Sequence, residues 1–231
     1  MTSGSDRVEA PRFLAEHWEK FRASGAVPAT PRLAATVILL RPGDDGFEVY
    51  VQRRAATMAF APGMYAFPGG SVDRAADYPQ IPNQSGDPVR VAWTSRMGLP
   101  LDDAQAVVRA AVRELAEEAG VAVEPATLAP WARWLTPEFE PRRFDTFFFL
   151  ARLPDGQGAR ETGGEADRVA WLAPAQAVRL PMLPPTRHTL AELARFATID
   201  EVFAAAETRD VSEPIRPVIE VEGEATWLRL V

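Results

Sequence analysis

Apolar and polar positions along the chain repeat with two periods, and each period predicts a different kind of element. In residues 11–24, "PRFLAEHWEKFRAS", apolar side chains recur at helical spacing and Gly25 follows as a C-cap, so we expect an N-terminal helix. The apolar run 33–40, "LAATVILL", predicts a buried strand. Residues 44–46, "DDG", predict a turn into the alternating segment "FEVYVQRR", so the two strands should form a hairpin.

The rest of the chain alternates between strand-like and helix-like segments. Residues 74–101 are rich in Pro, Asn, Gly and Ser and predict irregular structure. The remaining patterns predict strands at 64–70, 128–136, 143–153 and 168–172, helices at 102–119, 174–179 and 185–207, and a hairpin at 214–230. Strands mixed with few helices favour an α/β or α+β fold.

Composition and charge exclude several classes of protein. The 231 residues are 47% hydrophobic and 25% charged, which is typical of a globular chain. A formal net charge of −7 argues against a nucleic-acid partner. The absence of cysteine excludes disulfides, thiol nucleophiles and zinc–thiolate sites. The longest apolar run is too short to span a bilayer and the N-terminus lacks a signal pattern, so we expect a cytoplasmic protein without a membrane partner.

The helix expected at 102–119 carries a concentrated acidic motif, "RELAEEAG". On a helical wheel Arg113, Glu114, Glu117 and Glu118 fall within an arc of roughly 140°. The opposite arc is apolar, so this helix is expected to pack on a sheet with its carboxylates grouped on one side. Arg113 and Glu117 are spaced i,i+4 and can form an ion pair.

Two interpretations of these carboxylates remain open from the pattern alone. Acidic runs on amphipathic helices usually form a solvated face. A cation, however, would turn the i,i+4 repulsion between Glu114 and Glu118 into binding energy. Oxygen ligands without His or Cys suit Mg²⁺ or Mn²⁺ rather than zinc.

The segment "RELAEEAGV", residues 113–121, resembles the core of the Nudix box, Arg-Glu-hydrophobic-x-Glu-Glu-x-Gly-hydrophobic, at every fixed position. "FPGG", residues 67–70, resembles the glycine pair that opens the box, and the likeness extends from Leu33 to about Trp171. The resemblance implies an α/β/α sandwich with a mixed sheet, formed by one Nudix domain over residues 1–231 with extra C-terminal helices and a tail at 174–231. It also implies a diphosphatase that uses Mg²⁺ or Mn²⁺ to cleave a nucleoside diphosphate linked to another moiety.

The resemblance also implies roles for the box residues. Glu114, Glu117 and Glu118 would be metal ligands, joined by a backbone carbonyl of Gly69 or Gly70, and Arg113 would orient a glutamate. Glu117 is the first candidate for the catalytic base. For Glu165, in the loop before residues 168–172, a second base and a solvated loop acid both remain open.

Candidate substrate contacts lie outside the box core. Arg53, Arg54 and Arg143 are candidates to hold phosphates through bidentate hydrogen bonds, although a surface role is the alternative for each. Phe67 is a further candidate for a substrate contact. The expected partner is a small nucleotide diphosphate, and since Nudix proteins often dimerise, a homodimer is an alternative to a monomer.

The sequence departs from the box at one place. Gly70 and Arg113 are 43 residues apart rather than 14, so 29 residues are inserted, and residues 74–101 should form an excursion that lets Gly70 still meet the helix. The carboxylate expected eight residues before Arg113 is replaced by Gln105. Asp102 or Asp103 would either substitute for it or cap the helix, and capping is favoured.

The inserted arrangement is similar to the Nudix branch of the peroxisomal coenzyme A diphosphatases. "RRAATMAFAPGMYAFPGG", residues 53–70, matches most of that branch's pre-box signature, but its second arginine is Ala59. The leading hypothesis is therefore a hydrolase of coenzyme A or acyl-coenzyme A. The alternatives are a hydrolase of another nucleoside diphosphate derivative, such as an ADP-sugar or dinucleotide, and a Nudix-fold sensor that binds a nucleotide without cleaving it.

Overall fold

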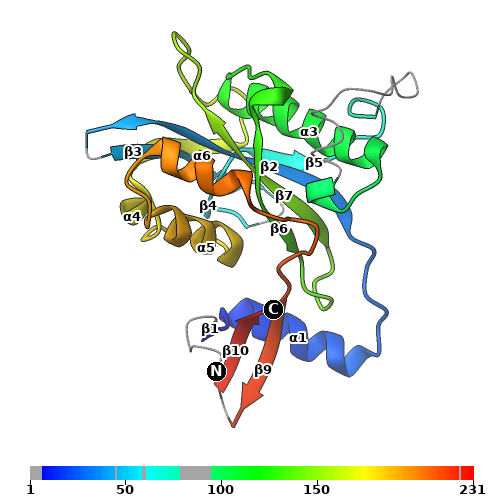
Figure 1. Cartoon of the computed structure of the whole chain (residues 1–231). Coiled ribbons are helices and arrows are strands. Elements are labelled where there is room, and N and C mark those ends of the chain that lie inside the picture. Colours follow the sequence, from blue (N-terminus) through cyan, green and yellow to red (C-terminus); the bar gives the residue numbers. More distant parts are fainter. Residues whose placement is uncertain (1–6, 45, 59–60, 79–94, 224) are drawn as a thin grey trace.

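A mixed sheet of seven strands forms the centre of the protein (Figure 1). The computed structural model describes residues 7–44, 46–58, 61–78, 95–223 and 225–231. The strands of this sheet are β2 (Arg32–Gly43), β3 (Gly46–Arg54), β4 (Tyr65–Ala66), β5 (Gly69–Ser71), β6 (Ala129–Leu135), β7 (Phe144–Arg152) and β8 (Ala166–Leu172). Their order is β4-β3-β2-β7-β6, with β5 paired to β2 and β8 to β3. Strand β2 runs parallel to β7 and antiparallel to β3 and β5, which confirms the expected mixed sheet.

Helices cover both faces of the sheet, so the fold is the expected α/β/α sandwich (Figure 1). Strand β2 shows why: Val37 and Leu39 belong to one core and Ile38 and Leu40 to the other, and all four are fully buried. The sequence of a strand that is buried on both faces is a continuous apolar run rather than an alternation of apolar and polar residues. The helical elements are α3 (Leu101–Ala119) on one face, α4 (Pro174–Ala177), α5 (Pro184–Leu193) and α6 (Ile199–Glu207) on the other, and the short 3-10 turn η1 (Pro125–Thr127).

A second, smaller sheet joins the two ends of the chain (Figure 1). It contains β1 (Arg7–Glu9), β10 (Ala225–Leu230) and β9 (Pro217–Glu222), all antiparallel in that order, and α1 (Arg12–Ser24) packs against it. Leu14 and Leu228 form its core with Phe139 from the β6–β7 connection. The hairpin at the C-terminal end was expected, whereas the pairing of β1 with it was not.

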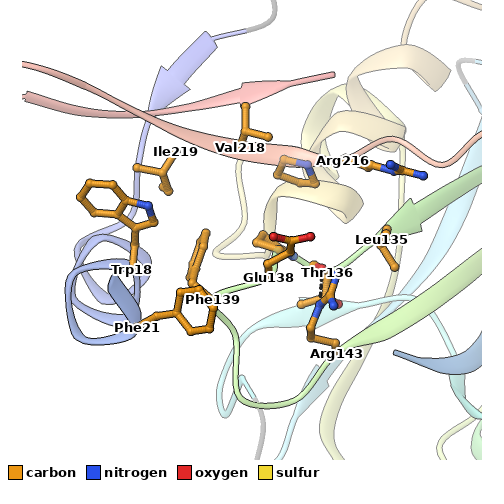
Figure 2. A pocket seen from close by; sticks show the side chains of 12 residues that line it. Trp18, Phe21, Leu135, Thr136, Glu138, Phe139, Arg143, Arg216, Val218 and Ile219 are labelled. Atoms are coloured by element: carbon orange, nitrogen blue, oxygen red, sulfur yellow. Dashed lines mark hydrogen bonds between the residues drawn. The ribbon is translucent and has the colours of Figure 1, made fainter. Parts of the chain in front are cut away.

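A cavity of about 390 Å³ lies between α1, the β6–β7 connection and β9 (Figure 2). Aromatic rings of Trp18, Phe21 and Phe139 line one side, and Arg143 and Arg216 line the other. The cavity marks the seam where the small terminal sheet meets the main body of the protein.

Most expected elements are present, with two differences. Helix α1 ends at Gly25 in the left-handed conformation, as expected. The single helix expected at 185–207 is wrong, because α5 ends at Leu193 and α6 restarts after a capping box between Thr198 and Glu201. The strand expected at 64–70 is two short strands on different partners. Residues 79–94 of the expected insertion lie outside the described residues.

Nothing among the described helices combines the length and the apolar character needed to cross a bilayer.

Candidate active site

Helix α3 places its acidic residues in unequal environments. Its apolar face, which includes Val107, Ala111 and Leu115, is fully buried against the sheet, as the helical wheel predicted. Glu118 is also buried, with only 5% of its surface exposed, whereas the side chain of Glu117 is 58% exposed. The three glutamates therefore do not form a uniformly solvated face.

Glu118 is held by two donors from the sheet. Its Oε2 accepts hydrogen bonds from the backbone N–H of Gly69, at 2.9 Å, and from the side-chain amide of Gln52. Gly69 is fixed in turn, because β5 pairs with β2 so that Gly69 lies opposite Thr36. The sheet register therefore returns the glycine pair to α3 across the inserted residues, which confirms that Gly70 and the helix meet.

Gly70 lies against a second, half-buried carboxylate, that of Glu114. A Cβ atom at residue 70 would stand 2.3 Å from Oε1 of Glu114, far closer than any van der Waals contact. Only glycine lets the backbone of β5 approach this carboxylate so closely. Glycine is therefore required at residue 70 to leave room for the carboxylate of Glu114, rather than to allow a turn.

Substituting Gly70 by alanine is expected to displace Glu114 and to reduce diphosphate hydrolysis at least tenfold. Because the obstructed atom is the end of a flexible side chain, the free energy of unfolding should fall by only about 1–2 kcal/mol. Steady-state hydrolysis and urea unfolding measure the two effects separately. Gly63→Ala is a suitable control because no atom lies within 4 Å of its added Cβ, although its positive φ costs stability. Equal activity in Gly70→Ala and wild-type protein would contradict the role of Gly70.

Arg113 connects the glutamates to a fourth carboxylate. Its Nε and Nη2 donate to the two oxygens of Asp77 at 3.0 and 2.9 Å, and its Nη1 donates to Glu114 at 2.9 Å and Glu117 at 3.0 Å. The expected i,i+4 pair with Glu117 is thus present. Asp77 is only 1% exposed, and its hydrogen bonds are the main cause that raises the pKa of Arg113. Arg113 can therefore orient three carboxylates at once.

Asp77 is the residue that the sequence analysis missed. The search for a fourth carboxylate counted back from Arg113 to Gln105, whose amide oxygen instead accepts a hydrogen bond from Arg109. Counting forward from Gly70 by the same pattern, five residues and then the acid, ends at Ala76, one residue short of Asp77, which lies within the expected insertion. Asp102 and Asp103 lie in the first turn of α3, where acidic residues favour the helix dipole, but neither is the N-cap residue, which is Pro100 without a side-chain cap.

Burial perturbs the two inner glutamates most. Desolvation raises the pKa of Glu118 to about 7, partly offset by the hydrogen bonds from Gly69 and Gln52, while Glu114 and Glu165 add repulsion. Desolvation likewise raises the pKa of Glu114, against the opposing charge of Arg113. Glu165 is exposed but lies close enough to act electrostatically on both glutamates, so the structure brings it to the same site.

The raised pKa of Glu118 predicts a pH-dependent difference between the wild-type protein and Glu118→Gln without divalent ions. A glutamate whose pKa rises from 4.5 unfolded to about 7 folded favours folding below 4.5 and loses this contribution as pH rises through 7. The Gln variant lacks that loss. The free energy of unfolding of Glu118→Gln should therefore rise relative to that of the wild-type protein between pH 4.5 and 7, by on the order of 2–3 kcal/mol. Urea unfolding at several pH values measures the difference, and parallel curves would contradict it.

The donors at this site suit a hard cation, although the side chains are not arranged around one point. Among the described residues, no three acidic or histidine side chains are grouped so that they could enclose a metal ion. Arg113, Gln52 and Gly69 occupy the carboxylates instead. Two features nevertheless fit a divalent ion: every side-chain ligand available is oxygen, and the buried amide oxygen of Gln52 has no hydrogen-bond partner.

The expected substrate contacts are distributed over several places. Arg53 is held by both oxygens of Asp167, at 2.6 and 2.9 Å, and the backbone N–H of Arg54 donates to Met64. Ala59 lies outside the described residues.

Two of these predictions do not fit the structure. Arg143 is buried and donates to the backbone carbonyls of Thr136 and Ala29, so it lines the cavity in Figure 2 rather than the carboxylate site. Phe67 is 3% exposed and packs edge-on against Phe148 in the core, so its ring is not available to a ligand.

Known proteins resemble this chain in sequence and in fold. The sequence model of the NUDIX domain matches residues 82–193, which include α3. The acyl-coenzyme A diphosphatase NUDT19 of Xenopus laevis is 22% identical over 254 residues, which cover 75% of this chain and 67% of that protein. The crystal structure of a NUDIX hydrolase from Alicyclobacillus acidocaldarius is 26% identical and superposes with a TM-score of 0.60, covering 80% of this chain and 99% of the other.

The sandwich fold, the acidic helix and these likenesses define an enzyme that hydrolyses acid anhydrides. Residues 82–193 match the NUDIX domain, and the chain is similar to Nudix diphosphatases in sequence and to a NUDIX hydrolase in fold. Nudix hydrolases in general use divalent metal ions.

Proposed function

We propose that this enzyme cleaves the diphosphate bond of coenzyme A or an acyl-coenzyme A with the help of Mg²⁺ or Mn²⁺. The observation that carries the proposal is a pair of carboxylates, buried Glu118 and half-buried Glu114, held against the glycines of β5. Like charges buried together are costly unless a cation compensates them. The acyl-coenzyme A activity of the Xenopus relative and the pre-box signature at residues 53–70 support this substrate class.

Glu114 and Glu118 are the residues that would hold the cation, with Glu117 and a carbonyl of Gly69 or Gly70 as further ligands. When bound, a divalent cation neutralises the diphosphate and lowers the pKa of a water molecule. Arg113 is a positioning residue, because it donates hydrogen bonds to Glu114 and Glu117 while Asp77 holds its guanidinium in place.

Glu117 is proposed as the base that accepts a proton from the attacking water. It is the most exposed glutamate of the helix motif, so its carboxylate can reach solvent and substrate. Glu165 is the alternative base, since it is exposed and close to the same cluster. Arg54 remains a candidate for a substrate phosphate.

A panel of diphosphates tests the substrate class. Coenzyme A, an acyl-coenzyme A, an ADP-sugar and a dinucleotide would be incubated with the enzyme and Mg²⁺ or Mn²⁺, and products separated by mass. We expect coenzyme A to yield adenosine 3′,5′-bisphosphate and phosphopantetheine. Faster cleavage of the ADP-sugar or dinucleotide would assign the enzyme to the alternative class, and cleavage without any divalent ion would contradict the metal requirement.

A further inference from the structure

Gln52 lies beside the acidic site, on a strand that the sequence analysis did not connect with it. Strand β3 alternates so that Tyr50 and Gln52 share the face toward α3. Gln52 is 3% exposed, and its Nε2 donates to Oε2 of Glu118. The other atom of the same amide, Oε1, is buried without a hydrogen-bond partner among the described residues.

The two donors to Glu118 act on one oxygen from two different strands. Gln52 approaches from β3 and the N–H of Gly69 from β5, and both donate to Oε2. Neither of these two donors contacts Oε1 of Glu118. Two fixed donors on one oxygen restrict rotation of the carboxylate, so Oε1 is the oxygen left to accept a ligand.

Stability alone does not account for a glutamine at residue 52. A buried amide oxygen without a partner costs about 1–3 kcal/mol, and an apolar side chain of similar length would avoid that cost. Buried polar groups that lack partners call for an explanation in the ligated or reacting state. The position of the amide next to Glu118 supplies one.

We propose that Gln52 is a positioning residue of the active site, which orients Glu118 so that its Oε1 is presented to the cation. This inference rests on the proposed function, in which Glu118 is a metal ligand. The unpartnered Oε1 of Gln52 is then an acceptor for a hydrogen-bond donor that enters with the ligand. Partners of metal-binding side chains commonly contribute 10–100-fold to metal affinity.

Gln52→Met tests the proposal, because methionine has a similar length but no donor. On the full chain, we expect the Mn²⁺ dissociation constant measured by titration calorimetry to rise 10–100-fold. The midpoint of thermal unfolding without metal should stay within a few degrees of wild type or increase, since the unpartnered amide oxygen is removed. A residue with a purely structural role would lower the midpoint and leave metal affinity unchanged.

Tyr50→Phe is the matched control. Tyr50 lies on the same face of β3 and its buried hydroxyl also lacks a partner among the described residues, but it makes no hydrogen bond to Glu118. We expect its Mn²⁺ affinity to stay within twofold of wild type. Unchanged Mn²⁺ affinity in Gln52→Met, or an equal loss of affinity in Tyr50→Phe, would overturn the role of Gln52. The proposed function would still stand if the wild-type protein binds Mn²⁺ and hydrolyses the diphosphate. If the wild-type protein neither binds Mn²⁺ nor hydrolyses the diphosphate, the proposed function itself is overturned, and the role of Gln52 with it.

Discussion

Replacing Glu117 by glutamine is expected to lower kcat for diphosphate hydrolysis by about 10²–10⁴-fold, the range typical of losing a general base. Glutamine keeps the size of the side chain but cannot accept the proton of the attacking water. The fold should be unaffected, because the side chain is 58% exposed and its ion pair with Arg113 lies partly in solvent. Such pairs contribute at most about 1 kcal/mol. Hydrolysis rates at saturating Mg²⁺ and urea unfolding of the same preparations measure the two quantities.

Glu16→Gln is a matched control for this variant. Glu16 also forms an exposed i,i+4 ion pair, with Arg12 on α1, far from the acidic motif in the sequence. Its activity and stability should equal those of wild type. If Glu117→Gln retains full activity and Glu165→Gln loses it, the base is Glu165. If neither variant loses activity, catalysis by a carboxylate base from this cluster is excluded.

Replacing Arg113 by methionine is expected to reduce the free energy of unfolding by about 3–5 kcal/mol, the range for a buried ion pair that loses one partner. Asp77, at 1% exposure, would lose its two hydrogen bonds from Arg113 and keep the one from the backbone N–H of Asp73. For a chain of this size the loss corresponds to a fall of roughly 10 °C in Tm. Hydrolysis should fall as well, since Glu114 and Glu117 lose the side chain that orients them.

Two further variants separate the buried charge from a general effect of removing an arginine. Arg53→Met also breaks a bidentate ion pair, with Asp167, but this pair is exposed and should cost no more than about 1 kcal/mol. Adding Asp77→Asn to Arg113→Met removes the uncompensated charge, so the double variant should be more stable than Arg113→Met alone. Similar Tm values for Arg113→Met and Arg53→Met would contradict a buried network at Arg113.

Local patterns in the sequence were sufficient for most of the fold. The period of 3.6 residues at 102–119 and the apolar run at 33–40 predicted α3 and β2, because both signals depend only on neighbouring residues and on burial. The split between α5 and α6 was missed because the apolar spacing continues across it. Its signal was the capping box at Thr198 and Glu201, which is also local.

The hydrogen-bond partners of the acidic residues could not be predicted from local patterns. Gln52 and Glu118 are 66 residues apart, and Asp77 and Arg113 are 36 apart. No periodicity links such positions, since the sheet register and the helix packing bring them together. The same holds for Phe67 and Arg143, whose residue types suit a ligand but whose surroundings are core and backbone carbonyls.

The sequence by itself determined which side chains are available for chemistry: an arginine and three glutamates on one side of a helix, a glycine pair upstream, and no cysteine. Only the tertiary structure decided that Glu118 is buried, that Asp77 pairs with Arg113 and that Gln52 donates to Glu118. The physical reason is that side-chain identity and helical spacing are local properties, whereas desolvation and hydrogen-bond partners depend on segments that meet only after folding.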